Sequence, residues 1–223
     1  YEEKTPLKDL TLDNLFIDIG AKDAEEARKL VQIGDFAVYE APRFEQNGVL
    51  CGPYLDNRIG CVTLLLMMEQ LADKEIENDL YFVFTAQEEV GLRGAGAAAF
   101  AVEPDAAIAA GVTDTGDLPE MKSAMAVELG KGPAVKVMDR SVICTPAVVD
   151  ALEQAAKDCG VSAQREILLC GGTDTSALQK ARAGVQAGAV SIPTRYIHSP
   201  SELCAVSDVE DAAKLLAQYA LRK

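Results

Sequence analysis

The alternation of strand-like and helix-like segments after residue 53 is the strongest constraint on the fold. Beyond Gly52 and Pro53, short apolar runs typical of buried strands are separated by longer stretches with helical periodicity. Strands separated by helices of this length indicate helices packed around a mostly parallel sheet, so the predicted fold class is α/β. The expected strands are 80–85, 106–112, 124–127, 134–138, 165–169 and 188–192, and the expected helices are 59–71, 93–101, 146–159, 173–180 and one from Val209, behind a capping box at 207–210.

The first 50 residues follow a different pattern. Short apolar patches at 15–19, 36–39 and 49–50 are broken by glycines and a proline. This pattern favours β structure, so we expect a small domain over residues 1–50 and a larger domain over residues 51–223. The chain begins with Tyr1 rather than Met, and we expect it to be the later part of a longer product.

The charge and the cysteines exclude several classes of protein. The 223 residues carry a formal net charge of −14, which repels phosphate groups, so nucleic acids and anionic membranes are poor partners. A small ligand or a metal cation suits this field better. Six cysteines without a CxxC spacing predict reduced thiols and a cytoplasmic location. No apolar run reaches the ~18 residues that cross a bilayer, so we expect a soluble protein without a membrane partner.

Four polar side chains occupy positions where ligand sites commonly form. Glu88 and Glu89 come directly after a predicted strand, and Asp56 precedes a predicted helix. His198, the only histidine of the chain, follows another predicted strand. Because loops at the carboxyl ends of strands converge in an open α/β sheet, we expect these side chains to lie close together.

The combination of carboxylates and an imidazole predicts a metal site. Zn²⁺, Co²⁺ and Mn²⁺ accept these ligands, and an ion would remove the repulsion between adjacent glutamates. One glutamate would bind the ion while its neighbour takes a proton from the attacking water. Each residue alone has a simpler interpretation. Adjacent glutamates are usually a solvated helix start, a lone histidine is usually a satisfied core or surface residue, and Asp56 can cap a helix. The metal hypothesis rests on the combination.

Six motifs occur along the chain in this order: LDNRIG (55–60), FTAQEEVGLRGA (84–95), VTDTGDLPE (112–120), ELGKGPAVKVMDR (128–140), CGGTDTSALQ (170–179) and TRYIHSPSE (194–202). Their order and spacing resemble the glutamyl or deblocking aminopeptidase family. Its members are dinuclear metallo-aminopeptidases that often assemble as tetrahedral dodecamers, and some carry the name endoglucanase. The segments 16–27 and 33–39 are similar to the small β-barrel domain that this family inserts into its catalytic domain. The resemblance implies that residues 1–50 are the remainder of that β-barrel and 51–223 the metallopeptidase catalytic domain.

The resemblance also implies a dinuclear centre of Zn²⁺ or Co²⁺, with Mn²⁺ as a further option. Asp56 would bridge the two ions and form a cis peptide bond with Asn57. Glu88 would be the general base. Glu89 would be a ligand of one ion and His198 a ligand of the other.

The remaining implications concern the partners. Asp174 and Gly172, in the GGTD stretch, correspond to positions near the substrate. The implied partners are peptide substrates and further copies of the chain, up to a dodecamer.

Two departures from the family pattern lower the expected activity. The family's first histidine ligand lies in an HxD segment upstream of the inserted domain, and these 223 residues contain no such segment. The family's VDVT-like motif has an aspartate ligand where this chain has Gly111. Asp114 lies three residues further on, but strand alternation directs it to the opposite face. Three of five expected ligands are in place, which predicts weak metal binding and low or no aminopeptidase activity in this chain.

Two other functions are compatible with parts of the sequence. A glycosidase would need two carboxyl groups about 5–9.5 Å apart across a sugar, and the adjacent Glu88 and Glu89 fit that arrangement poorly. The absence of tryptophan also argues against a sugar-stacking surface. A non-catalytic subunit that keeps the fold and its assembly contacts is favoured by Gly111, and is opposed by the intact motifs around Glu88 and His198.

Overall fold

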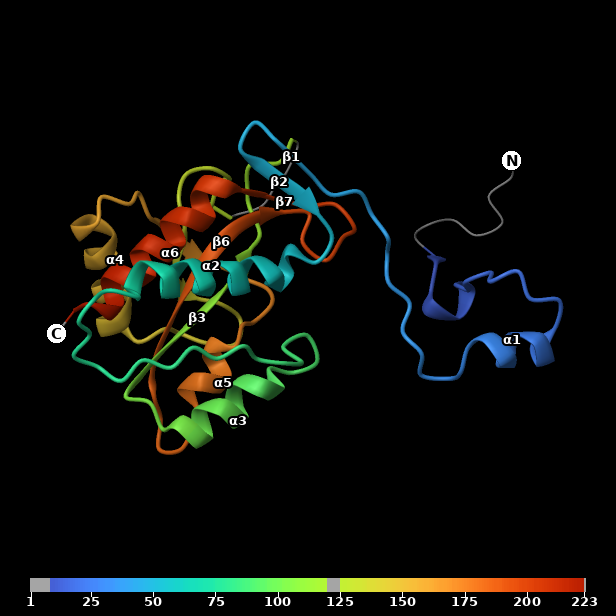
Figure 1. Cartoon of the computed structure of the whole chain (residues 1–223), viewed down its shortest axis with the longest axis horizontal. Helices are drawn as coiled ribbons and strands as arrows, with labels where there is room; N and C mark the ends of the chain where they lie inside the picture. The colour runs from blue at the N-terminus through green and yellow to red at the C-terminus, as the bar shows by residue number, and fades with distance from the viewer. Residues whose placement is uncertain (1–8, 120–124, 223) are drawn as a thin grey trace. The chain divides into compact units, whose positions relative to one another are not determined.

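The computed structural model describes residues 9–119 and 125–222. Contacts between residues divide the chain into two units, Tyr1–Val38 and Tyr39–Lys223 (Figure 1). The division falls earlier than the predicted boundary after residue 50, because the strands that follow residue 43 belong to the sheet of the larger unit. That residues 1–50 are the remainder of an inserted β-barrel domain stays a prediction.

The smaller unit contains only short helical elements among its described residues. A 3-10 helix, η2 (Leu12–Asn14), is followed by α1 (Ala24–Leu30). Helix α1 starts where it does because the Asp23 carboxylate accepts a hydrogen bond from the Glu26 amide, at 2.9 Å. The patches 15–19 and 36–39, expected as β structure, form no strand, since no described segment pairs with their backbone.

The larger unit is built on one seven-stranded sheet. The strand order is β1-β2-β7-β6-β4-β5, and β3 pairs with β6 off this path. The strands are β1 (Phe44–Gln46), β2 (Val49–Gly52), β3 (Ala106–Thr113), β4 (Ala134–Met138), β5 (Gln164–Ile167), β6 (Gln186–Arg195) and β7 (Glu202–Ala205).

The sheet is mixed and open. Strand β3 runs parallel to β6 and β4 runs parallel to β5, whereas the pairs β1·β2, β2·β7, β4·β6 and β6·β7 are antiparallel. The predicted α/β class with helices flanking a sheet is confirmed. The sheet is less parallel than predicted because the short links between β1 and β2 and between β6 and β7 can join only antiparallel neighbours.

Helices pack on the sheet in two groups (Figure 1). Helices α2 (Leu55–Leu71), α4 (Pro146–Asp158) and α6 (Val206–Ala220) share the main core with the strands. Helices α3 (Arg93–Val102) and α5 (Thr175–Gln179) pack together around a smaller apolar cluster. Burying one apolar face of each helix against the sheet is what holds this layered arrangement together.

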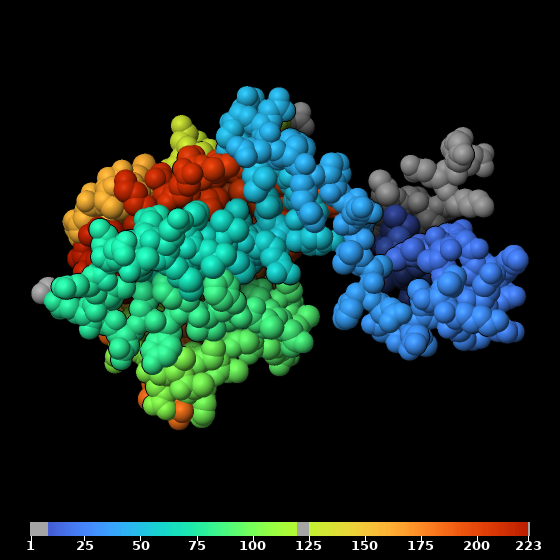
Figure 2. Space-filling model, in the orientation of Figure 1, coloured from blue at the N-terminus to red at the C-terminus, as the bar shows by residue number. Residues whose placement is uncertain are grey.

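Two predicted strands are wrong. Residues 80–85 form no strand, and Tyr81 and Phe84 are exposed. The apolar run has the composition of a strand, but no described segment pairs with its backbone, and pairing is what makes a strand. The predicted strand at 124–127 begins outside the described residues, and 125–127 form no strand. In Figure 2, α2, α3 and the chain between them, coloured cyan to green, form much of the visible face of the larger unit.

The predicted capping box of the last helix is also wrong. Helix α6 begins at Val206, one residue before Ser207, and its N-cap residue Ala205 makes no side-chain cap. Asp208 turns instead to the loop before β4, where its carboxylate accepts hydrogen bonds from the amides of Gly130 and Gly132.

Among the described residues, no helix is long and apolar enough to span a membrane.

Candidate metal centre

Three predicted site residues come together although they are far apart in the sequence. Asp56 lies at the start of α2, Glu89 in the turn before α3, and His198 in the loop between β6 and β7. Each offers a ligand atom, and the three atoms lie within 4.8 Å of one another. The Nε2 atom of His198 is 3.1 Å from Asp56 Oδ2 and 3.5 Å from Glu89 Oε2.

The chemistry of these three donors fits a divalent cation. Donor atoms held about 2.1 Å from one Zn²⁺ ion are ~3–4 Å apart, which is the spacing that His198 makes with its two carboxylate neighbours. Two carboxylates and one imidazole suit Zn²⁺, Co²⁺ and Mn²⁺ alike. Three protein ligands leave at least one position of a four-coordinate ion open to a small molecule.

The backbone around Asp56 is fixed by a set of close polar contacts. Residue 56 departs from helical geometry, and the expected cis peptide bond joins it to Asn57. The Asn57 side chain donates to the Ala110 carbonyl at 2.9 Å and accepts from the Gly60 amide at 3.2 Å. A β-carbon on Gly60 would lie 2.7 Å from the Ala110 carbonyl oxygen, so this close approach of α2 to β3 requires glycine.

Burial and like charges raise the pKa of two carboxyl groups in the centre. Burial, then the neighbouring Glu89 carboxylate, raises the pKa of Asp56 to about 6, although His198 opposes the shift. Burial, followed by the charges of Glu89, Asp174 and Asp56, raises the pKa of Glu88 to about 7. A carboxyl group with a pKa near neutrality can both accept and release a proton there, which is what a general base requires.

The turn that carries Glu88 and Glu89 is tied to the first turn of α3. The Leu92 amide donates to the Glu88 carbonyl at 2.9 Å, and the Gly94 amide donates to the Ala86 carbonyl at 2.9 Å. A β-carbon on Gly94 would lie 2.6 Å from the Ala86 amide nitrogen. Glycine at position 94 therefore lets the turn close against the helix.

Asp174 lies on the Glu88 side of the centre. Its Oδ2 accepts a hydrogen bond from the Thr85 hydroxyl at 2.7 Å, and its charge contributes to the raised pKa of Glu88. Its Oδ1 is buried and has no hydrogen-bond partner within the described residues. A buried carboxylate oxygen without a partner is a place where a donor group of a ligand can bind.

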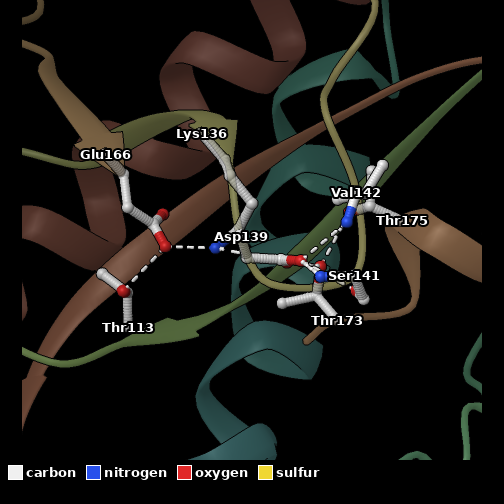
Figure 3. Close-up of polar contacts among 8 residues, drawn as sticks. All are labelled: Thr113, Lys136, Asp139, Ser141, Val142, Glu166, Thr173 and Thr175. Carbon is white, nitrogen blue, oxygen red and sulfur yellow. Dashed lines mark hydrogen bonds and ion pairs between the residues drawn. The ribbon is translucent and has the colours of Figure 1, made fainter. Parts of the chain in front are cut away.

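A buried ionic cluster supports the loop that leads to Asp174 (Figure 3). Lys136 forms ion pairs with Glu166 and, at 3.7 Å, with Asp139, and all three side chains are fully buried. The Thr113 hydroxyl donates to Glu166 at 2.8 Å. The Thr173 hydroxyl donates to Asp139 at 3.2 Å, which connects this cluster to the residue directly before Asp174.

Gly172 belongs to the same loop. A β-carbon there would lie 2.7 Å from the Ser141 hydroxyl oxygen, and Ser141 in turn donates to Asp139. Gly172 therefore packs closely against the turn that the Asp139 carboxylate organises.

Two further predicted positions lie outside the group of three. Asp114 is half-buried just past the end of β3; burial raises its pKa and the His198 charge lowers it. Its carboxylate is not among the ligand atoms that converge within 4.8 Å. Gly111 lies within β3, and a β-carbon there would be 3.8 Å from Asn57 Nδ2. Position 111 thus lies beside the segment that carries Asp56.

Several residues around the centre hold backbone angles that non-glycine residues rarely adopt. Positive φ angles occur at four of them: Tyr54 (63°), Gln87 (62°), Tyr196 (58°) and His198 (60°). Each such residue costs on the order of 1–3 kcal/mol, and residues of this kind concentrate at functional sites because the surrounding structure has to hold them there.

One residue of the site was missed from the sequence. Glu202, the first residue of β7, contacts the backbone of both Asp56 and His198. In the sequence, only its position four residues after His198 marks Glu202. That position does not distinguish it from the other 34 Asp and Glu residues of the chain.

Comparison with known proteins gives a consistent result. The sequence pattern of the M42 glutamyl aminopeptidases matches residues 1–215. A relative from Acetivibrio thermocellus is 48% identical over 219 residues, which are 98% of this chain and 66% of the relative. The structure of the aminopeptidase APDkam598 from Desulfurococcus kamchatkensis superposes with a TM-score of 0.92 at 36% identity, covering 96% of this chain and 61% of that one.

A third similar protein is the TET1 peptidase of Pyrococcus horikoshii, which can assemble into a tetrahedron or a large octahedral shell. It gives a TM-score of 0.81 at 34% identity, covering 92% of this chain and 60% of that one. The chain spans about two thirds or less of the length of the relatives that it matches.

Proposed function

Because the chain belongs to the M42 glutamyl aminopeptidase family, a family of hydrolytic enzymes, we propose that it is part of a metal-dependent aminopeptidase. Its substrates are peptides with a free N-terminus, and the reaction is hydrolysis of the first peptide bond. The observation that carries the proposal is the convergence of Asp56, Glu89 and His198 within 4.8 Å, next to a glutamate with a raised pKa.

In this proposal the residues divide into three groups. Asp56, Glu89 and His198 hold divalent metal, either Zn²⁺, Co²⁺ or Mn²⁺. When bound, such an ion polarises a carbonyl group and makes water more acidic. Glu88 takes the proton from the attacking water and passes it to the leaving amine.

Asp174 and Gly172 belong to the substrate side of the site. The free Oδ1 of Asp174 is an acceptor for a donor group of the peptide, and its burial makes that contact worth more than one in water. Gly172 brings the backbone of the same loop close to the Asp139 turn.

We propose further that activity is low in this chain. The three converging residues are enough for one ion, whereas the dinuclear centre of the family requires five ligands. Gly111 supports this proposal because it has no side chain at the position where the family has an aspartate. Asp114 is not among the converging ligand atoms. A site that lacks ligands binds its ions weakly, because water has to replace each missing side chain.

Gly111 also favours a second candidate, a non-catalytic subunit of the same fold. The two candidates differ in one measurable respect, because a weak enzyme hydrolyses an aminoacyl-anilide when excess metal is supplied and a non-catalytic subunit does not. A glycosidase would instead release reducing sugar without added metal.

The proposal also includes self-assembly and a cytoplasmic location. The ability of the P. horikoshii relative to form closed shells supports self-assembly.

The test is hydrolysis of a set of aminoacyl-anilides by the purified chain, with and without millimolar Co²⁺ or Zn²⁺. The proposal predicts slow hydrolysis that requires the ion and is lost in Glu88→Gln. Hydrolysis that does not depend on metal, or that persists in Glu88→Gln, would overturn it.

A further inference from the structure

We propose that Glu202 is the residue that positions the metal centre, because its single buried carboxylate holds the backbones of both Asp56 and His198. This inference rests on the proposed function, since it concerns the same centre. Glu202 is not one of the three converging ligands, so it acts through two of them.

Each oxygen of the Glu202 carboxylate has its own partner. Oε2 accepts a hydrogen bond from the Asp56 amide at 3.0 Å, and Oε1 accepts one from the His198 amide at 2.9 Å. The side chain is almost completely buried, with 2% of the residue exposed. Hydrogen bonds from backbone amides to an ionised acceptor in such surroundings are short and strong.

The fold explains why residue 202 can reach both amides. Strand β7 pairs with β2 in a register that sets Glu202 opposite Gly52, and the chain continues from there through a turn into Asp56. His198 lies four residues before Glu202 on the same chain. One side chain at the start of β7 thus lies between two segments that are 142 residues apart.

Both ligands need such support because regular structure does not hold their backbones. Asp56 lies in α2 but has non-helical angles, with φ −77° and ψ 109°. His198 has a φ of 60°, in the left-handed region that few non-glycine residues adopt. Ligands held this way move apart when their common anchor is lost.

The chain contains a matched control in Asp208. Its carboxylate is also buried, with 1% of the residue exposed, and also accepts two backbone amides, from Gly130 at 2.7 Å and Gly132 at 2.9 Å. Neither partner is a candidate ligand. A substitution at Asp208 therefore causes the same kind of structural damage without touching the metal centre.

Two variants of Glu202 separate position from charge. Glu202→Gln keeps the size and removes the charge, and it replaces one acceptor by an NH₂ group that cannot accept from an amide. Glu202→Asp keeps the charge but is one methylene shorter, so it cannot reach both amides. A positioning role requires both variants to fail, whereas a purely electrostatic role requires Glu202→Asp to behave like the parent.

The experiment is a Co²⁺ titration of the full chain and its variants, followed by calorimetry and by the visible absorption of Co²⁺. We expect Co²⁺ affinity to fall about 10- to 100-fold in Glu202→Gln and in Glu202→Asp, and to stay within about threefold in Asp208→Asn. Equal affinities in the parent and Glu202→Gln, or full affinity in Glu202→Asp, would overturn the inference.

Amide hydrogen exchange provides a second measurement that needs neither metal nor activity. The amides of Asp56 and His198 should both be protected in the metal-free parent and in Asp208→Asn. In Glu202→Gln, which keeps a single acceptor oxygen, at least one of the two amides should exchange freely. If the parent binds no Co²⁺, the proposed function fails while exchange still decides this inference. If the Glu202 variants do not fold, exchange in the parent alone decides the inference. Unprotected amides at Asp56 and His198 would refute the positioning role of Glu202, and protected amides would support it.

Discussion

Gly111 faces Asn57 across a space that a side chain can occupy: a β-carbon on Gly111 would lie 3.8 Å from Asn57 Nδ2, in ordinary van der Waals contact. Asn57 directly follows Asp56, so a carboxylate at position 111 would enter the surroundings of the candidate centre. The structure therefore leaves room for a β-carbon at position 111, where the resemblance implies an aspartate ligand.

The first prediction is that Gly111→Asp strengthens metal binding. An added carboxylate supplies one of the missing ligands, so we expect Co²⁺ affinity to rise about tenfold or more, with little loss of stability. Calorimetric titration measures the affinity. Gly111→Asn, which has the same size without the charge, is the control and should leave affinity unchanged. Equal affinities in the two variants would show that position 111 does not contribute to the centre.

The second prediction separates Glu88 from Glu89. Glu88→Gln should reduce metal-dependent hydrolysis by about 10²-fold or more, because it removes the proton acceptor, while Co²⁺ affinity changes less than about threefold. Glu89→Gln removes a ligand and should lower both. Anilide hydrolysis and calorimetry, performed on the same preparations, test this division. A parallel loss of binding and hydrolysis in Glu88→Gln would be inconsistent with its role as a base.

The third prediction concerns pH. The pKa of Asp56 is raised to about 6, so below that value it holds a proton that a cation has to displace. Metal affinity should therefore be full above about pH 7 and should fall by up to about tenfold per unit as the pH drops below about 6. Co²⁺ titrations near pH 5, 6 and 7.5 measure the effect, and a flat profile would exclude Asp56 as a ligand.

The fourth prediction concerns the buried cluster of Lys136, Glu166 and Asp139. Lys136→Met leaves two buried carboxylates without their cation, which should lower the free energy of unfolding by about 3–5 kcal/mol. Denaturant unfolding measures this. Arg165→Met breaks an ion pair with Glu153 at the surface and should change stability far less. Equal losses in the two variants would show that the buried cluster contributes no more to the free energy of unfolding than a surface ion pair does.

Many helices and strands of the larger unit could be predicted from the sequence because each depends on residues that are close together along the chain. Strand β4 is predicted to the residue, and α3 and α4 to within one residue, since apolar periodicity and flanking breakers determine each of them. The convergence of Asp56, Glu89 and His198 was expected from their places at element ends, and the structure brings these three together.

The remaining features depend on contacts between distant segments. The apolar run 80–85 has the composition of a strand but lacks a pairing partner among the described residues. The short strands β1 and β7 were missed because three or four residues carry too little periodicity, whereas the patch at 49–50, expected as β structure, lies in β2. Glu202 was missed for a similar reason, since its importance comes from two backbone amides, and the β2·β7 register is what brings one of them, the Asp56 amide, to it.

The most direct test of the candidate metal centre is a Co²⁺ titration of the parent chain beside His198→Ala, with the visible absorption of the ion as the signal. We predict saturable binding of about one ion per chain, weaker than in a complete dinuclear site, and loss of that signal in His198→Ala. No saturable binding by the parent, or the same signal without His198, would contradict a metal centre formed by Asp56, Glu89 and His198.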